Sequence, residues 1–350
     1  MESSAVVCSV LFALVALVPG PTEGLGYLLG RSYMEPCERG AGACMTSLEC
    51  GLQRGQSLGS CSIGVCCRVE KTCNEVINFN NTFFVHPADV RPSSSCSVAV
   101  EKKWVPGGIC QLKLDFLEFE TVGPSFQSGM CLHDTFSVAG ADKVPPIICG
   151  LNDRQHMYVD VRNARNIHLM MNLGLNVTNR RWKIKVSQIP CYSPRLAPPD
   201  CLQYYEEPTG YIKSFNYGNI HNDTSYQLNL RYRMCFRETC TVQLNQLGSF
   251  GLGAQSAGGD SANQITDVAV DTDCVNHKSN SAVSSAYIAI DDTRFCGSRF
   301  LRSYETTNPV SSMTFQSPLR EVGRDDPNRK FDGFMVQYRQ NCGLRGNNNR

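Results

Sequence analysis

Nineteen cysteines in 350 residues constrain this chain more than any other feature of its sequence. Reducing compartments keep thiols unpaired, so this many cysteines is typical of a chain that folds where disulfides form. The first one, Cys8, lies in the apolar run Val6–Val18, which Pro19 and Gly20 end. The run is too short to span a bilayer and predicts a secretory signal peptide over residues 1–24. Removing Cys8 from nineteen leaves eighteen, an even number that nine disulfides would pair completely.

Charge and the C-terminus also bear on where the protein works. The formal net charge is +1, so no strong overall field draws the chain to nucleic acid or to an anionic membrane. The polar tail at 343–350 predicts neither a membrane anchor nor a lipid-attachment signal. We therefore expect a secreted, extracellular protein without a membrane span, and no nucleic-acid partner.

A dense group of cysteines follows a lead at 25–36 that we expect to be unstructured. About thirty residues, 37–67, bury too little apolar surface to fold alone, so three disulfides would supply the stability. Which cysteines pair is left open; the six are Cys37, Cys44, Cys50, Cys61, Cys66 and Cys67. The adjacent pair that ends this knot resembles the end of a clip domain, an arthropod module usually found ahead of trypsin-like proteases. A generic disulfide knot is the alternative.

The remaining cysteines repeat in order, which predicts two copies of one unit at 73–191 and 201–342. The fifth cysteine of each copy precedes a glycine, and the sixth follows a predicted strand. The first copy has Cys73, Cys96, Cys110, Cys131, Cys149 and Cys191, and the second has Cys201, Cys235, Cys240, Cys274, Cys296 and Cys342. Three prolines in the spacer 192–200 predict an extended, semi-rigid link between the copies.

Apolar and polar residues alternate along several segments of both copies, as in strands with one buried face. The pattern is clear in 112–116, 157–161, 182–186 and 226–234. Antiparallel sheets that pack face to face show this alternation. We therefore predict an all-β fold of two antiparallel β-sandwiches in tandem, after a small disulfide-rich module.

The segment after Cys201 has a sequence pattern that is similar to that of a known family. Gly210-Tyr-Ile-Lys-Ser-Phe-Asn-Tyr217 resembles the opening of a CUB domain, with Phe215 where that family usually has proline. The chain resembles the secreted arthropod proteins with two CUB domains, closely over residues 73–342 and loosely over 37–67. This resemblance implies extracellular modules that bind other macromolecules.

The resemblance also implies a disulfide pattern, although six cysteines in one copy allow fifteen connectivities. It implies Cys73–Cys96, Cys131–Cys149, Cys201–Cys235 and Cys274–Cys296, and it leaves Cys110–Cys191 and Cys240–Cys342 to pair. Strand parity agrees with this in the second copy. In the first, Cys191 is out of phase with Trp182, and a bulge near Pro190 would be needed to correct the phase.

Many CUB domains bind calcium, and the resemblance points to Glu120 and Asp134 as weak candidate ligands in the first copy. Glu120 lies farther from Cys131 than the family pattern allows, and the third position falls near Asn172 instead of an aspartate. Calcium needs six to eight oxygen ligands with sufficient carboxylate charge. We therefore expect no cofactor, with calcium as the one possibility, and no site in the second copy, where 274–278 has no acid.

Three sequons, at Asn80, Asn176 and Asn222, predict N-glycans at exposed positions. No catalytic residue is expected. The Gly55–Gly59 segment has the letters of a nucleophile elbow, which needs a strand, a turn and a helix, but it lies within the knot.

These features predict a non-catalytic secreted protein that recognises extracellular proteins or glycans. The alternative is a non-enzymatic cofactor or regulator of an extracellular serine-protease cascade, suggested by the clip-like knot.

Overall fold

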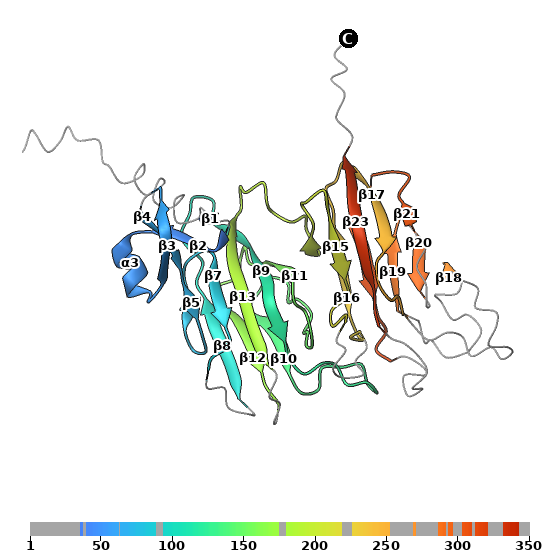
Figure 1. Cartoon of the computed structure of the whole chain (residues 1–350), viewed down its shortest axis with the longest axis horizontal. Helices are drawn as coiled ribbons and strands as arrows, with labels where there is room; N and C mark the ends of the chain where they lie inside the picture. Colours follow the sequence, from blue (N-terminus) through green and yellow to red (C-terminus); the bar gives the residue numbers. More distant parts are fainter. Residues whose placement is uncertain are drawn as a thin grey trace, which may run out of the picture.

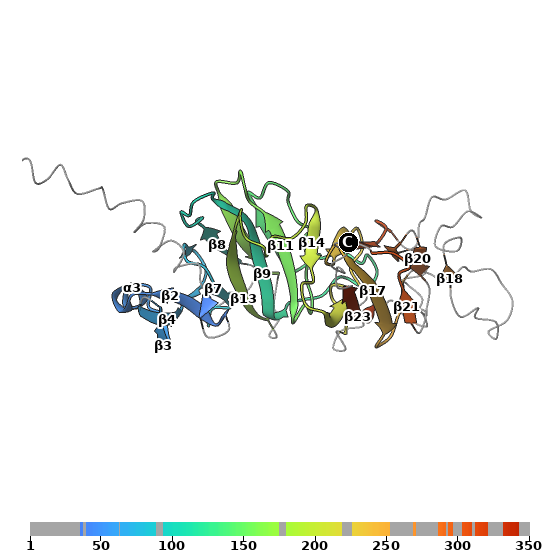
Figure 2. The same ribbon diagram turned by 90° about the horizontal axis from the view of Figure 1, so that it is seen from above.

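The protein is a row of three β-rich parts (Figures 1 and 2). Seen from above in Figure 2, the N-terminal knot, a first sandwich and a second sandwich follow one another along the long axis. The computed structural model describes residues 36–37, 40–62, 64–88, 94–174, 180–218, 226–252, 269–270, 286–291, 293–296, 303–309, 312–320 and 332–342. None of the helices in these ranges has both the length and the apolar character needed to cross a membrane.

The knot, residues 37–67, is a small antiparallel sheet with one short helix. The sheet order is β1-β2-β4-β3. The helix begins after Thr46, whose hydroxyl accepts a hydrogen bond from the Glu49 amide while the Glu49 carboxylate accepts one from the Thr46 amide. The elements are β1 (Pro36–Cys37), β2 (Gly42–Met45), α3 (Ser47–Leu52), β3 (Gln56–Cys61) and β4 (Gly64–Arg68). The three bridges left open by the sequence are Cys37–Cys66, Cys44–Cys61 and Cys50–Cys67.

The first sandwich packs the sheet β10-β12-β8-β6 against the sheet β11-β9-β13-β7-β5. Alternate residues of β9 and β13, such as Leu114 and Trp182, are buried between the sheets. The strands are β5 (Glu70–Lys71), β6 (Val76–Ile77), β7 (Thr82–Val85), β8 (Ser95–Val100), β9 (Ile109–Glu120), β10 (Thr135–Ala139), β11 (Gln155–Asp160), β12 (Ile167–Asn172) and β13 (Arg181–Pro190).

The second sandwich packs β14-β16-β22-β19-β20-β18 against β15-β23-β17-β21. The strands are β14 (Cys201–Tyr204), β15 (Thr209–Lys213), β16 (Arg231–Cys235), β17 (Cys240–Gln246), β18 (Ala269–Val270), β19 (Tyr287–Ile290), β20 (Thr293–Cys296), β21 (Ser303–Glu305), β22 (Ser312–Gln316) and β23 (Met335–Cys342). The fold is all-β with two sandwiches in tandem. Three short edge strands, β5, β6 and β14, pair in parallel with their neighbours, and the other described pairs are antiparallel.

One predicted strand begins later than its alternation indicates. The apolar residues Tyr226, Leu228 and Leu230 are buried, but regular pairing starts only at Arg231. Asn229 has a left-handed backbone with φ of 56°, which breaks the extended conformation. Alternation therefore identified the buried side chains correctly and the strand start incorrectly.

Five disulfides of the two sandwiches lie within the described residues, and two of them, Cys201–Cys235 and Cys240–Cys342, join two strands. Cys73–Cys96, Cys131–Cys149 and Cys201–Cys235 are pairs that the resemblance implies, and Cys110–Cys191 and Cys240–Cys342 are the pairs that it leaves. Cys296 is disulfide-bonded, and Cys274 lies outside the described residues. The predicted bulge is confirmed, because the pairing of β13 with β9 shifts between Ile189 and Pro190.

The spacer 192–200 is packed on the first sandwich instead of extended. Ala197 is buried, and its amide donates to Gln111 Oε1 while its carbonyl accepts from Gln111 Nε2, at 2.9 and 3.1 Å. Turns closed by Pro190 and Pro198 carbonyls lie on either side. The prolines thus shape turns here, and the buried contact holds the spacer in place.

Candidate functional site

Asp134, the better of the two calcium candidates, lies in the loop before β10 with its carboxylate fully buried. Its Oδ1 accepts hydrogen bonds from the Gly174 amide and Arg180 Nη2, both at 2.9 Å. Its Oδ2 accepts from the Val122 amide at 3.0 Å and from Arg180 Nε at 2.7 Å. Each carboxylate oxygen has two acceptor sites, so four hydrogen bonds use all of them. No acceptor site of this carboxylate remains for a metal ion.

Arg180 supplies the positive charge at this position. Its side chain is 5% exposed, and Nη2 also donates to the Gly174 carbonyl at 2.9 Å. A guanidinium keeps its charge at any physiological pH, and here it makes a two-pronged pair with a buried carboxylate. A divalent cation would be repelled by Arg180 and would have to displace it.

The other calcium candidates are also engaged. Glu120 accepts from Arg181 Nε at 2.9 Å, and the Nη2 of the same guanidinium donates to Asp153 at 2.7 Å. Asn172, at the third position, is exposed and donates to the Thr135 hydroxyl. No group of three or more histidine, cysteine or acidic side chains in the described ranges could hold a metal. The residues present therefore do not fit a calcium ion; positions 274–278 of the second copy lie outside the described residues.

The family-like segment of the second sandwich is placed against the first sandwich. Asn216, with φ of 63°, accepts from the Leu151 amide, and its own amide donates to Asn152 Oδ1, both at 2.9 Å. A Cβ on Gly150 would lie 1.9 Å from Asn216 Oδ1, so only glycine fits after Cys149. The Cys-Gly pattern of the first copy thus marks a close contact between the sandwiches.

A buried amide network continues this joint. Gln155 Nε2 donates to the Ser214 carbonyl at 3.2 Å and its Oε1 accepts from Gln203 Nε2 at 3.3 Å. All three residues are buried, and the apolar cores of the two sandwiches form one continuous cluster. Buried polar networks with satisfied partners favour one defined arrangement. The two sandwiches are therefore joined by buried apolar and polar contacts.

His156 lies at the same joint, on β11. Its Nε2 accepts a hydrogen bond from the Tyr204 amide at 3.1 Å, and its ring packs against Tyr205 with centroids 5.0 Å apart. Burial, together with the nearby Lys113 ammonium, lowers the pKa of His156 to about 4, and Asp115 offsets only part of this shift. The imidazole is thus neutral at physiological pH, as its acceptor role requires.

The sequence also contains a run of basic residues along β13. Lys183 pairs with Glu70 at 2.6 Å, Lys185 pairs with Asp115 at 3.4 Å, and Arg181 pairs with acids of β9 and Asp153. These residues form the outer face of a strand and are already paired within the chain.

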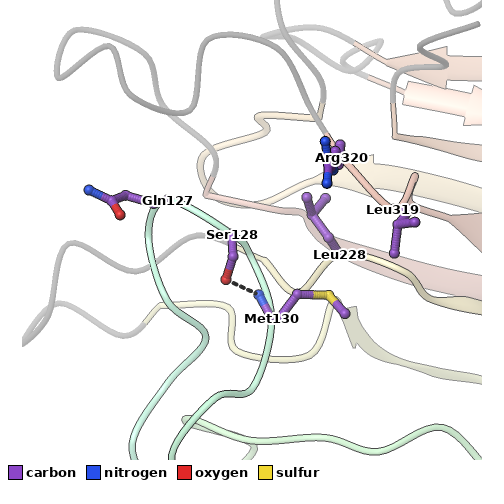
Figure 3. A pocket seen from close by; sticks show the side chains of 6 residues that line it. All are labelled: Gln127, Ser128, Met130, Leu228, Leu319 and Arg320. Carbon is purple, nitrogen blue, oxygen red and sulfur yellow. Dashed lines mark hydrogen bonds between the residues drawn. The ribbon is translucent and has the colours of Figure 1, made fainter.

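Described residues line cavities between the parts of the molecule, of which two matter here. One, of about 460 Å³, lies between the loop at 127–130 of the first sandwich and Leu228, Leu319 and Arg320 of the second. Figure 3 shows Met130, Leu228 and Leu319 as its apolar side chains, with the Met130 amide donating to Ser128 Oγ.

The other cavity, of about 380 Å³, we call the junction pocket. It is formed where the knot, the outer face of β9 and β13, the spacer and the start of the second sandwich meet. Five charged side chains line it: Lys113, Asp115, Lys185, Arg195 and Glu206. Sequence reasoning missed this pocket, because its charges come from four separate segments.

The sequon at Asn80 does not have the exposure that we expected. Its side chain is 6% exposed, and Oδ1 accepts from the Gln188 and Asn81 amides at 2.7 and 3.0 Å. A sugar on this amide would have to be accommodated inside the packed edge of β7. Asn176 and Asn222 lie outside the described residues.

We expect Asn80 to carry no glycan in the secreted protein, because a sugar on its Nδ2 would have to fit beside a residue that is only 6% exposed. Glycopeptide mass spectrometry with enzymatic deglycosylation in heavy-oxygen water would report conversion at each sequon. Full occupancy at Asn80 would contradict this expectation, and an Asn80→Gln variant, which lacks this sequon, is the control.

The nucleophile-elbow letters do not form that motif. Gly55 precedes β3, and Ser57 is an exposed residue on that strand, not at a strand–turn–helix junction.

Comparisons with known proteins bear on the second sandwich above all. Residues 198–341 match the family model of the animal CUB domain, a range that begins in the spacer and ends in β23. No curated protein matched the chain significantly.

Solved structures that are similar to this chain include two CUB1-EGF-CUB2 fragments. The CUB1-EGF-CUB2 domains of rat MASP-1 are 12% identical, with a TM-score of 0.27 over 75% of this chain and 99% of that one. The human MASP-1/3 fragment is 13% identical, with a TM-score of 0.24 over 74% and 98%. The extracellular region of zebrafish Gpr126/Adgrg6 is 14% identical, with a TM-score of 0.29 over 79% and 38%. TM-scores this low indicate neither how the sandwiches are arranged nor what they bind.

Proposed function

We propose that this chain is a secreted, non-catalytic binding protein that recognises extracellular proteins or glycans through its CUB-like sandwiches. The observation that carries the proposal is the match of residues 198–341 to the animal CUB domain, whose members generally mediate extracellular protein–protein interactions. The disulfides that staple both sandwiches agree with an extracellular setting.

The rigid joint suggests how recognition would work. Because the buried network of Asn152, Gln155 and Asn216 holds the sandwiches together, their loops present surfaces in a fixed relation. A rigid scaffold with exposed loops is a common way to display a binding surface. Trp104, which is 71% exposed in a loop of the first sandwich, is of the residue type that often dominates binding energy.

The second candidate is a regulator of an extracellular serine-protease cascade. The knot favours it, because its three disulfides hold a short helix on which Leu48 and Leu52 are 74% and 73% exposed. Such a protein would act as a scaffold or cofactor for proteases that other chains supply.

The test is capture of partners from extracellular fluid on the immobilised mature protein, followed by binding assays with each purified candidate. We expect saturable binding to at least one extracellular protein or glycan, and no turnover of peptide or ester substrates. Recovery of protease zymogens or inhibitors would favour the second candidate. Substrate turnover by the purified chain would contradict both.

A further inference from the structure

The floor of the junction pocket carries a net positive charge. Lys113 and Lys185 both pair with Asp115, with N–O distances of 3.0 and 3.4 Å, so two ammonium groups share one carboxylate. Burial alone would raise the pKa of Asp115, but these two ammonium groups outweigh it and hold that pKa below its ordinary value. The carboxylate thus stays ionised, and one positive charge on the floor has no counterpart.

The rim of the pocket adds one charge of each sign. Arg195, from the spacer, is exposed, and Glu206 follows β14. Neither side chain makes an ion pair with another described residue. Both side chains influence the pKa of the Tyr158 phenol. Burial raises this pKa, Glu206 raises it further, and Arg195 lowers it. The rim therefore offers a free guanidinium and a free carboxylate to the same small volume.

Neutral polar groups complete the wall. Ser187 Oγ donates to Asn81 Oδ1 at 2.8 Å, which leaves the serine oxygen free to accept another hydrogen bond. Ser193, on the spacer, has a hydroxyl that already accepts from the Arg195 amide and can still donate. Uncharged donors and acceptors thus lie beside the charged ones.

This combination of cations, a carboxylate and neutral hydroxyls favours one kind of ligand. A volume of about 380 Å³ is within the range of small-ligand pockets, about 300–1,000 Å³. A single acidic side chain of a protein would satisfy the cations and leave Glu206 facing its negative charge. A sugar with one acidic group satisfies both the cations and Glu206. Its acid accepts hydrogen bonds from Lys185 and Arg195, and its hydroxyls donate to carboxylates.

We propose that the junction pocket binds one anionic sugar unit, a hexuronate or a sulfated hexose, of an acidic glycan. The inference rests on the proposed recognition function and narrows it to one site and one ligand class. Because the pocket needs the knot, the first sandwich and the spacer together, it exists only in the assembled chain.

The test is a ligand-observed NMR titration of the full mature chain with glucuronate, glucose 6-sulfate and neutral glucose. We expect the acidic sugars to bind with dissociation constants of about millimolar order, at least about tenfold tighter than glucose. Lys185→Gln and Arg195→Gln should each weaken glucuronate binding about fivefold or more. The Arg195 variant alters an exposed side chain, so it tests the pocket without disturbing the packed floor.

Lys183→Gln is the matched control. It removes the same charge from the same strand and face, but Lys183 pairs with Glu70 outside the pocket. We expect glucuronate binding to be unchanged in it. An equal loss in all three variants would mean attraction by general charge and would overturn the proposal.

Three other outcomes would also overturn it. These are equal binding of glucose, no binding of either acidic sugar, or tighter binding of a tetraglutamate peptide with the same variant profile, which would identify a protein acid as the ligand. Failure here is distinguishable from failure of the proposed function. Saturable capture of an extracellular partner that persists in Arg195→Gln would leave recognition standing and remove only this site.

Discussion

Replacing Arg180 with methionine is expected to destabilise the first sandwich by about 3–5 kcal/mol, because it leaves the buried Asp134 carboxylate without its cation. Methionine keeps much of the volume of the side chain, so the loss would come from charge and hydrogen bonds. Asp134 would retain only the Val122 and Gly174 amides as donors. Denaturant unfolding, followed by hydrogen exchange of peptides from the first sandwich, measures the effect.

Arg181→Met is the matched control for Arg180. Its side chain is 42% exposed and pairs with Glu120 and Asp153 near the surface. Exposed ion pairs contribute about 0–1 kcal/mol, so this variant should lose little stability. Equal losses in the two variants would show that the buried pair has no special role.

The same pair predicts how the protein responds to calcium. At about 5 mM calcium, a site with a dissociation constant of about 1 mM would stabilise the fold by about 1 kcal/mol. Because Arg180 and the Val122 and Gly174 amides together occupy the acceptor sites of Asp134, we expect the wild-type Tm to be the same in calcium and in chelator. A rise in Tm with calcium that Asp134→Asn abolishes would restore the calcium site.

The strands could be predicted because a sheet with one buried face leaves a two-residue period in the sequence. Leu112, Leu114 and Phe116 follow that period, and they lie buried on β9. Even the bulge near Pro190 followed from parity, since a disulfide to Cys191 needs the phase to change there. The period fails before Arg231, where Asn229 turns the chain without moving its apolar neighbours out of the core.

The contacts that decide the site could not be predicted in the same way. Asp134 was recognised as a candidate ligand, but its partner Arg180 is 46 positions away, and no local pattern connects them. A sequon is defined by three adjacent residues, so the sequon at Asn80 does not indicate that this side chain is buried. Long-range pairs depend on how the sheets stack, and no local pattern in the sequence shows that stacking.

The short helix of the knot does have a local sequence signal. Thr46 and Glu49 are spaced as in a capping box, and they begin the helix α3 within the knot. The helix has only six residues, too few to show a helical period, so the cap was its only sequence signature.

The joint between the sandwiches is expected to weaken as pH falls from about 6.5 toward 4, because of His156. Its pKa is lowered to about 4 in the folded protein from an ordinary value of 6.5, so in this window the unfolded state binds a proton that the folded state does not. Stability therefore falls as pH decreases and is fully regained above pH 6.5. The full loss is about 3 kcal/mol.

Protonation acts directly on the hydrogen bond from the Tyr204 amide, since His156 Nε2 can then no longer accept. The charged ring would face Lys113, which repels it, and Asp115, which attracts it, with the Tyr158 and Tyr205 rings packed around it. Hydrogen exchange of a peptide covering 201–205 should therefore speed up between pH 6.5 and 4, after correction for the intrinsic exchange rate.

His156→Gln separates this effect from other titrations, because glutamine offers an acceptor that does not bind a proton in this range. Burial also lowers the pKa of His86, so the wild-type slope contains a second contribution that the variant retains. We expect the pH dependence at 201–205 to flatten in His156→Gln and to persist in His168→Gln, whose side chain lies on β12 away from the joint. An unchanged slope in His156→Gln would show that the joint does not depend on this imidazole.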